Sequence, residues 1–162
     1  MNCHLTQHIS LTINNNLEEG TIFLRNLNCI RYQLEIKWAS HHLANVITSG
    51  QPYEKSGTLR LISPEDVNQI SIPHGQSAVV SVCGSAAFGL GTEGMIDLYR
   101  DETTLIASLY WNGPWKQIGN ELHLTNLDNE RYLAEVSTPP FEGILGDLAV
   151  DIRDAVVDNP LQ

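Results

Sequence analysis

Apolar and polar residues alternate with a period of two along most of this chain. The clearest case is the segment 32–38, in which Tyr32, Leu34, Ile36 and Trp38 are separated by single polar residues. This spacing places successive side chains on opposite faces of an extended chain, so it predicts a strand with one buried face. The same alternation occurs at Ile9/Leu11/Ile13, Ile22/Leu24, Leu59/Leu61, Ile70/Ile72, Leu105/Ala107/Leu109, Leu122/Leu124, Tyr132/Ala134/Val136 and Leu148/Val150/Ile152.

A further segment, 78–82, contains four apolar residues in five and predicts a strand buried on both faces. Turn residues separate the predicted strands at 14–16, 19–20, 49–52, 63–64, 73–75, 113–114, 128–129 and 139–140. A single helical turn is predicted from Pro64 to Asn68, with Ser63 as its N-cap. About ten short strands and no amphipathic helix predict an all-β fold, an antiparallel β-sandwich or barrel.

Length and composition fit one domain. The chain has 162 residues, of which 42% are hydrophobic, enough for one well-buried core and few for two. We find no repeat, linker or low-complexity tract, so the prediction is a single domain over residues 1–162, with a tail from Val156 to Gln162 that frays. Any function is then expected in loops of one scaffold.

The segment 110–115, with the sequence Tyr-Trp-Asn-Gly-Pro-Trp, places three large aromatic residues around a Gly-Pro turn. Aromatic side chains at a turn often face a partner outside the protein. Tyrosine and tryptophan suit a boundary between apolar and wet surroundings, so lipid headgroups, a sugar or a partner protein are the candidates. The alternative is that the three rings cap one end of the core.

Charge excludes several partners. Nineteen acidic and nine basic residues give a formal net charge of -10, which repels nucleic acid and anionic lipid surfaces. A membrane would have to attract the protein through neutral or zwitterionic headgroups, aromatic burial or a receptor. No apolar run is long enough to span a bilayer, and the segment 1–10 lacks the features of a secretory signal. We therefore expect synthesis in the cytoplasm without a classical signal peptide.

Cysteine and histidine spacing predicts no metal site and no cofactor. Cys3, Cys29 and Cys83 form an odd set without C-x-x-C spacing, so three reduced thiols are expected, with one bridge and one remaining thiol as the alternative. The adjacent His41 and His42 would face opposite sides of a strand. His4 and His8 are four apart, a spacing that would need a helix where none is predicted.

No catalytic motif is evident. The segment 89–94 fits the G-x-G-x-x-G pattern of nucleotide sites, but a short strand-like segment follows it in place of a helix. The sequence has no G-x-S-x-G and no H-E-x-x-H, and its paired acids at 18–19, 65–66 and 101–102 are at turns, where acids are usually solvated. We expect no enzyme. A pair of acids that flanks a sugar bond stays open, because such a pair is defined by its separation in space and has no sequence motif.

Four motifs in order resemble the aegerolysin family of small acidic β-sandwich proteins. They are Cys83-Gly84, Gly91-Thr92-Glu93-Gly94 with Asp97-Leu98, Tyr110-Trp111 with Pro114-Trp115, and Gly143-Ile144-Leu145-Gly146 leading to Val150-Asp151. The resemblance covers roughly residues 9–151. It implies an antiparallel β-sandwich that recognises particular sphingolipids or sterol-rich membranes. It also implies the small targeting component of a two-component pore-forming toxin, in some bacterial members insecticidal, with a larger partner that inserts.

The resemblance carries Trp115 and Trp38 over as lipid-contacting rings, with Trp111 in the same motif. Leu90 stands where lipid-selective fungal members have a glutamate in the Gly-rich loop, and the nearest acid is Glu93. His8 or Ile9 replaces an aromatic residue near the N-terminus. These departures put selectivity for a phosphoethanolamine headgroup in question. The candidate lipid-binding residues are Trp38, Leu90, Glu93, Tyr110, Trp111 and Trp115.

The expected action is extracellular, at target cell membranes, with membrane lipid or a receptor and a larger pore-forming protein as partners. Other function classes stay open. In a carbohydrate-binding module, Trp111 and Trp115 would stack on sugars while Asn112 and Glu93 reach hydroxyls. A hydrolase would use Asp or Glu residues on the sandwich. A homo-oligomeric structural protein is the remaining alternative.

Overall fold

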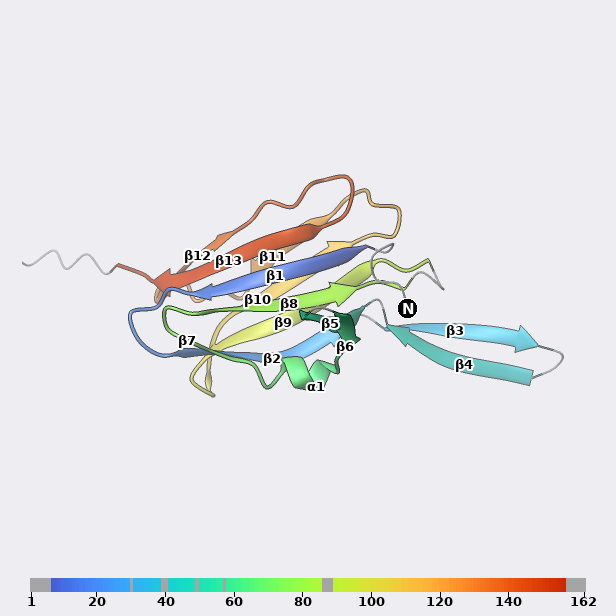
Figure 1. Ribbon diagram of the computed structural model, residues 1–162, viewed down its shortest axis with the longest axis horizontal. Helices are drawn as coiled ribbons and strands as arrows, with labels where there is room; N and C mark the ends of the chain where they lie inside the picture. Colours follow the sequence, from blue (N-terminus) through green and yellow to red (C-terminus); the bar gives the residue numbers. More distant parts are fainter. Residues whose placement is uncertain are drawn as a thin grey trace, which may run out of the picture.

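The alternating segments of the sequence form two sheets that face each other, as the computed structural model shows (Figure 1). The structure describes residues 7–29, 31–38, 41–48, 50–56, 58–85 and 89–156, without the side chains of 31–48 and 55–58. One sheet has the order β12 (Tyr132–Val136), β13 (Gly146–Asp154), β1 (His8–Asn15), β8 (Ser77–Cys83), β5 (Gln51–Ser56), β6 (Thr58–Leu61). The other has the order β11 (Glu121–Thr125), β10 (Thr104–Gly113), β9 (Thr92–Arg100), β2 (Thr21–Cys29), β7 (Ser71–Pro73).

A two-stranded hairpin, β3 (Arg31–Trp38) with β4 (His41–Thr48), extends beyond one end of the sandwich (Figure 1). The one helix in the described part of the chain is α1 (Pro64–Val67). The β-sandwich prediction is confirmed. The described residues contain thirteen strands against about ten expected, and β4, β5 (Gln51–Ser56) and β9 (Thr92–Arg100) are the three that match none of the predicted strands.

Pairing is antiparallel at every interface of the described strands except one. β1 and β13 run parallel, with Leu11 opposite Leu148 and Ile13 opposite Val150. The strands are far apart in sequence, so the crossover that a parallel pair requires is available. This pairing places β1, near the start of the chain, beside β13, near its end, within the six-stranded sheet.

The core lies between the two sheets and follows the alternation in the sequence. In β1, Ile9, Leu11 and Ile13 are at most 2% exposed. Facing residues of the other sheet, including Leu24, Ile96 and Leu98, are fully buried. Burial of an aliphatic side chain of this size contributes about 1.5–3 kcal/mol, so the two inner faces supply the main stabilisation.

Two expected burial patterns are wrong. The phase of β10 shifts at a bulge between Leu105 and Ala107, so Ile106 is fully buried while Leu105 is partly exposed. In β8, Val79 is 57% exposed, so this strand is not buried on both faces. Leu61 on the edge strand β6 is also exposed.

The helix prediction is confirmed by a capping box at its start. The Asp66 amide donates to Ser63 Oγ at 3.2 Å, and the Ser63 amide donates to the Asp66 carboxylate at 2.9 Å. Both bonds satisfy amides that a helix start leaves unpaired. Hydrogen bonds to the carboxylate from the backbone amide of Ser63 and from its side chain lower the pKa of Asp66, because they favour its charged form.

The cysteine prediction of three reduced thiols is wrong. Cys83 is disulfide-bonded, which agrees with the alternative of one bridge and one remaining thiol. Cys29 is a free, buried thiol whose pKa is raised to about 11 by burial. Cys3 lies outside the described residues.

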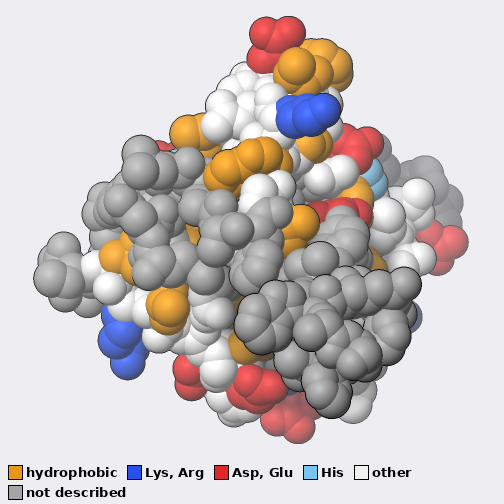
Figure 2. Space-filling view, turned by 90° about the vertical axis from the view of Figure 1, so that its right-hand side faces the viewer, with side chains coloured by type: hydrophobic (Ala, Val, Ile, Leu, Met, Phe, Trp, Pro, Cys, Tyr) orange, Lys and Arg blue, Asp and Glu red, His pale blue; other side chains and the backbone are white. Residues whose placement is uncertain are grey.

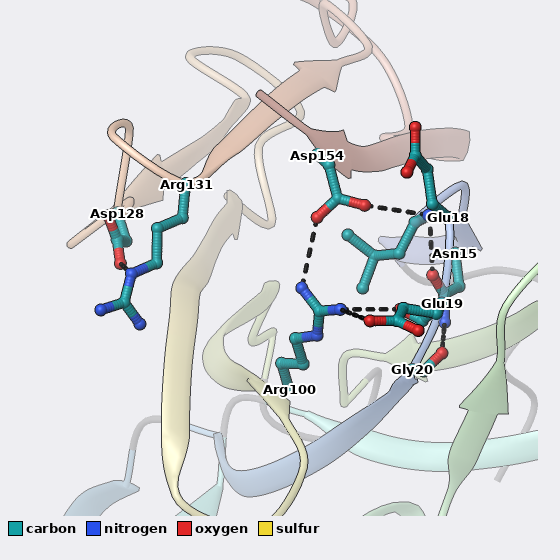
Figure 3. A network of polar contacts seen from close by, with 9 residues as sticks. Asn15, Glu18, Glu19, Gly20, Arg100, Asp128, Arg131 and Asp154 are labelled. Atoms are coloured by element: carbon teal, nitrogen blue, oxygen red, sulfur yellow. Dashed lines mark hydrogen bonds and ion pairs between the residues drawn. The ribbon is translucent and has the colours of Figure 1, made fainter. Parts of the chain in front are cut away.

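A polar network joins the two sheets at the end opposite the hairpin (Figure 3). Arg100 of β9 contacts Asp154 of β13 at 3.2 Å and donates to the carbonyl of Glu19 at 3.1 Å. The amide of Glu18 donates to the other Asp154 oxygen at 2.9 Å. Since β9 and β13 belong to different sheets, this network fixes one end of the sandwich.

Candidate functional site

Several loops meet at the end of the sandwich from which the hairpin extends (Figure 1). They are the connections after β8, after β10 and before β13. The Gly-rich segment 89–91 and the aromatic turn at 113–115, which are separate in sequence, therefore lie side by side. This arrangement agrees with the prediction that function lies in loops of the scaffold.

A groove of about 320 Å³ lies between these two segments and is lined by Gly89, Leu90, Gly91, Thr92, Glu93, Asn112, Gly113, Pro114 and Trp115. It brings together three of the candidate residues, Leu90, Glu93 and Trp115. Trp115 is 38% exposed, so its ring is available at the surface. These three residues are 25 or fewer positions apart in sequence, but only the pairing of β9 with β10 makes them neighbours.

Gly91 of the G-x-G-x-x-G segment and the nearby Gly84 serve close backbone packing. A Cβ on Gly91 would lie 2.0 Å from the carbonyl oxygen of Gly113, and one on Gly84 would lie 2.3 Å from the carbonyl oxygen of Leu90. No side chain fits at either position. Strand β9 begins at Thr92, so the segment leads into a strand and lacks the helix N-terminus of a phosphate site.

The expected exposure of Trp111 is wrong. Its ring is 1% exposed and its indole Nε1 donates to Thr92 Oγ1 at 3.0 Å inside the sandwich. The ring also lies against Gly94, where a Cβ would be 2.5 Å from Trp111 Cζ2. The inward alternation of Leu109 continues to Trp111, so the residues on either side of it, Tyr110 and Asn112, face outward. Trp111 therefore caps the core, which was the alternative interpretation of the aromatic segment.

Tyr110 lies on the outer face of the five-stranded sheet, partly buried. Its hydroxyl donates to Glu93 Oε1 at 2.8 Å, and its ring packs on His123 with 4.9 Å between centroids. The hydroxyl thus orients the carboxylate that borders the groove. Trp38 is the last residue of β3, opposite His41, and its side chain lies outside the described part.

Sequence reasoning missed three exposed apolar residues beside Trp115. Ile118 is 57%, Phe141 66% and Ile144 37% exposed. We call these three and Trp115 the apolar rim. Hydrophobic side chains are visible across the upper half of this end, with few basic side chains among them (Figure 2). Apolar residues within the Pro/Gly-rich segment 139–146 were the available signal, since such loops are usually polar.

Hydrogen bonds hold the two loops of the apolar rim together. The Gly119 amide donates to the Phe141 carbonyl at 2.9 Å, and the Gly143 amide donates to the Gln117 carbonyl at 2.8 Å. Ile118 and Glu142 also form an isolated β-bridge. The exposed side chains are consequently displayed on a paired, hydrogen-bonded surface.

The side chain of Gln7 anchors these loops from inside and is 1% exposed. Its Oε1 accepts from the Leu145 amide at 2.8 Å, and its Nε2 lies within 3.1 Å of both Asn120 Oδ1 and the Gly143 carbonyl. Nε2 also lies 3.3 Å from the Pro114 carbonyl. The segment before β1 therefore connects the turn that carries Trp115 to the loop that carries Phe141 and Ile144.

The described residues contain no group of three or more His, Cys, Asp or Glu placed to hold a metal ion. Within the same ranges, no helix has the length and apolar character needed to cross a membrane. The groove is bordered by a single carboxylate, Glu93, whereas acid-catalysed cleavage of a sugar bond generally uses two. Its surface is better suited to contact than to covalent chemistry.

The architecture defines an all-β sandwich protein with an apolar loop end. The family model for aegerolysins matches residues 33–155, more than half of the chain, so the protein belongs to the aegerolysin family. Asp-hemolysin of Aspergillus fumigatus is 29% identical over 133 residues, covering 74% of this chain and 94% of that protein.

Two solved structures share the fold. The RahU protein, in a complex with a TRIS molecule, superimposes with a TM-score of 0.73 at 20% identity, covering 94% of this chain and 98% of its own. IP-1A from Alcaligenes faecalis gives 0.68 at 21% identity, covering 95% of each chain. The fold resemblance therefore extends across the sandwich beyond the four motifs.

Proposed function

We propose that this aegerolysin recognises membrane lipid through the apolar rim and the adjacent groove. The observation that carries the proposal is the display of four exposed apolar side chains on two loops that are hydrogen-bonded to each other. Exposed apolar patches of this kind mark interaction surfaces. A tryptophan beside a polar groove suits the interface between headgroups and hydrocarbon.

The energetics favour reversible docking. The rim side chains are between 37% and 66% exposed, so covering each one fully contributes on the order of 1 kcal/mol, and the four together about 4 kcal/mol. That magnitude is small against the cost of association. Headgroup contacts in the groove must then supply the remaining affinity and the selectivity. Glu93, oriented by Tyr110, is suited to accept from a headgroup ammonium, while Leu90 is suited to a sterol or acyl surface.

The net charge of -10 disfavours anionic membranes, so zwitterionic sphingolipids in sterol-rich domains are the proposed targets. Weak docking cannot drive insertion of a strand hairpin, and we therefore assign the chain the role of the small targeting component of a two-component pore-forming toxin. Insect gut membranes are the first target to test. The disulfide at Cys83 supports action outside the cell, where such bonds persist.

Vesicle sedimentation tests lipid docking. Wild-type protein should sediment with sphingomyelin–cholesterol vesicles, and Phe141→Ala and Trp115→Ala should each weaken binding about fivefold, the equivalent of 1 kcal/mol. Leu133→Ala is the matched control, because Leu133 is 41% exposed but lies on β12 outside the rim. Equal losses in the control and the rim variants would contradict the proposal. Permeabilisation by a candidate partner, with and without this protein, tests the targeting role separately.

A carbohydrate-binding module remains the second candidate, because the groove places Asn112 and Glu93 next to the exposed ring of Trp115. Trp111 is unavailable for stacking, since it is buried. A glycan array separates the two functions. Binding to a soluble glycan that Trp115→Ala abolishes, with no sedimentation on lipid vesicles, would favour the module.

A further inference from the structure

A second groove, of about 530 Å³, runs along β1 and β8 of the six-stranded sheet and reaches the α1 region. Its floor includes Ser10, Thr12 and Ser81, which alternate with the buried residues of β1 and β8 and so face outward. The volume falls within the range of about 300–1,000 Å³ that is typical of small-molecule sites. Neither the rim nor the groove beside Trp115 shares a lining residue with it.

One half of this second groove is a polar row across four neighbouring strands. Tyr53 of β5 is opposite Ser81 of β8, Ser81 is opposite Ser10 of β1, and Ser10 is opposite Asp147 of β13. Residues directly opposite one another share a face of the sheet. The two serine hydroxyls are 2.9 Å apart, so a hydroxyl pair separates a tyrosine at one end from a carboxylate at the other.

The other half is apolar. β5 pairs with β8 at Gln51–Tyr53, and beyond this pairing the groove passes along Val79 and Val80 of β8. Ile62, Val67 and Ile70 line it. Val80 faces the core, opposite Leu11, and both Val80 and Val67 are at most 3% exposed, so the groove meets the core at this point. A continuous apolar trough thus adjoins the polar row.

Charge distinguishes Asp147 from the other carboxylate of the groove. Glu54 is paired with Arg60 at 2.5 Å. Asp147 is exposed, and its side chain has no hydrogen-bond or ion-pair partner among the residues the structure describes. The net charge of -10 adds a field that attracts cations to this carboxylate.

We propose that the second groove binds a monomeric single-chain amphiphile with an ammonium head. An ammonium has three donors and no acceptor, which matches the Asp147 carboxylate and the oxygens of Ser10 and Ser81. The hydrocarbon chain lies along Val79 and the trough beside it, and removes these side chains from water. Tyr53 is only 9% exposed and offers little ring face, so the groove suits an amphiphile better than a sugar. The proposal is independent of lipid docking by the apolar rim.

Titration calorimetry with decylamine below its micelle concentration tests the assignment. Decylamine should bind at least about tenfold more tightly than decyl sulfate, and its affinity should fall with added salt as an ion pair requires. Hexylamine should bind more weakly than decylamine, because its shorter chain has fewer methylenes to bury. Equal affinity for the amine and the sulfate, or preferential binding of a neutral hexose, would overturn the proposal.

Variants locate the site. Asp147→Asn should weaken decylamine binding about fivefold, the upper range for an exposed ion pair, while Glu130→Gln, an exposed acid in the turn before β12, should leave it unchanged. Val79→Asn should reduce the advantage of decylamine over hexylamine. Trp115→Ala should bind decylamine as the wild type does, whatever its effect on vesicles. Wild-type affinity in Asp147→Asn would refute the site.

Discussion

Replacing Gln7 with leucine removes the polar anchor of the loop end at nearly constant volume. In the wild type, this buried side chain accepts from the Leu145 amide at 2.8 Å and donates toward Asn120 Oδ1 and the Gly143 carbonyl at 3.1 Å. Leucine supplies none of these bonds. The Leu145 amide is then left buried without its acceptor.

The size of the effect follows from which groups lose their partners. A buried unsatisfied amide costs about 1–3 kcal/mol, and each lost neutral hydrogen bond costs about 0.5–1.5 kcal/mol. The Gly143 carbonyl keeps a donor, because Asn120 Nδ2 also reaches it at 2.9 Å. We therefore expect a loss of about 3 kcal/mol in the free energy of unfolding, or about 6–12 °C in Tm for a chain of this size.

Urea denaturation measures the loss, and vesicle sedimentation at a temperature where the variant is folded measures its consequence. Binding should weaken, because Gln7 connects the turn of Trp115 to the loop of Phe141. Gln69→Leu is the matched control at an exposed glutamine. A change below about 1 kcal/mol in Gln7→Leu, similar to that in the control, would refute the anchoring argument.

Three further outcomes are expected. Arg100→Gln should lower the free energy of unfolding by about 2 kcal/mol, measured by urea denaturation, because it breaks the partly buried contact with Asp154, and an unchanged midpoint would contradict this. Since hydrogen bonds from Ser63 lower the folded-state pKa of Asp66, its stabilising effect is present above the unfolded pKa of about 4 and is lost as pH falls through the folded pKa. The stability difference between wild type and Asp66→Asn should therefore be constant from pH 7 to 5 and shrink below pH 4, as acid-dependent melting would show. Gly91→Val should lower Tm and abolish vesicle binding, because its Cβ would overlap a backbone oxygen at 2.0 Å, and normal binding would contradict the packing of the groove.

The fold could be predicted because its main determinant is local. Alternation in β1 and β2 specifies which face of each strand is buried, and the predicted helical turn carries its own cap at Ser63. The parallel pairing of β1 with β13 was beyond prediction, since backbone hydrogen bonds between distant segments leave no local pattern. The bulge in β10 was also beyond prediction, because an extra residue in one strand of a pair leaves no local pattern. It changes which residues of β10 face the core.

The sequence determined by itself that this protein is an all-β, acidic chain with a conspicuous aromatic turn. Only the tertiary structure decided that Trp111 faces the core and Trp115 the surface. Trp111 lies within β10 and points inward, whereas Trp115 follows the Gly-Pro turn at the end of the strand and is exposed. It also brought Phe141 beside Trp115 through the hydrogen bonds of two distant loops. Exposure depends on which segments pack together in space, and that information lies in no single stretch of sequence.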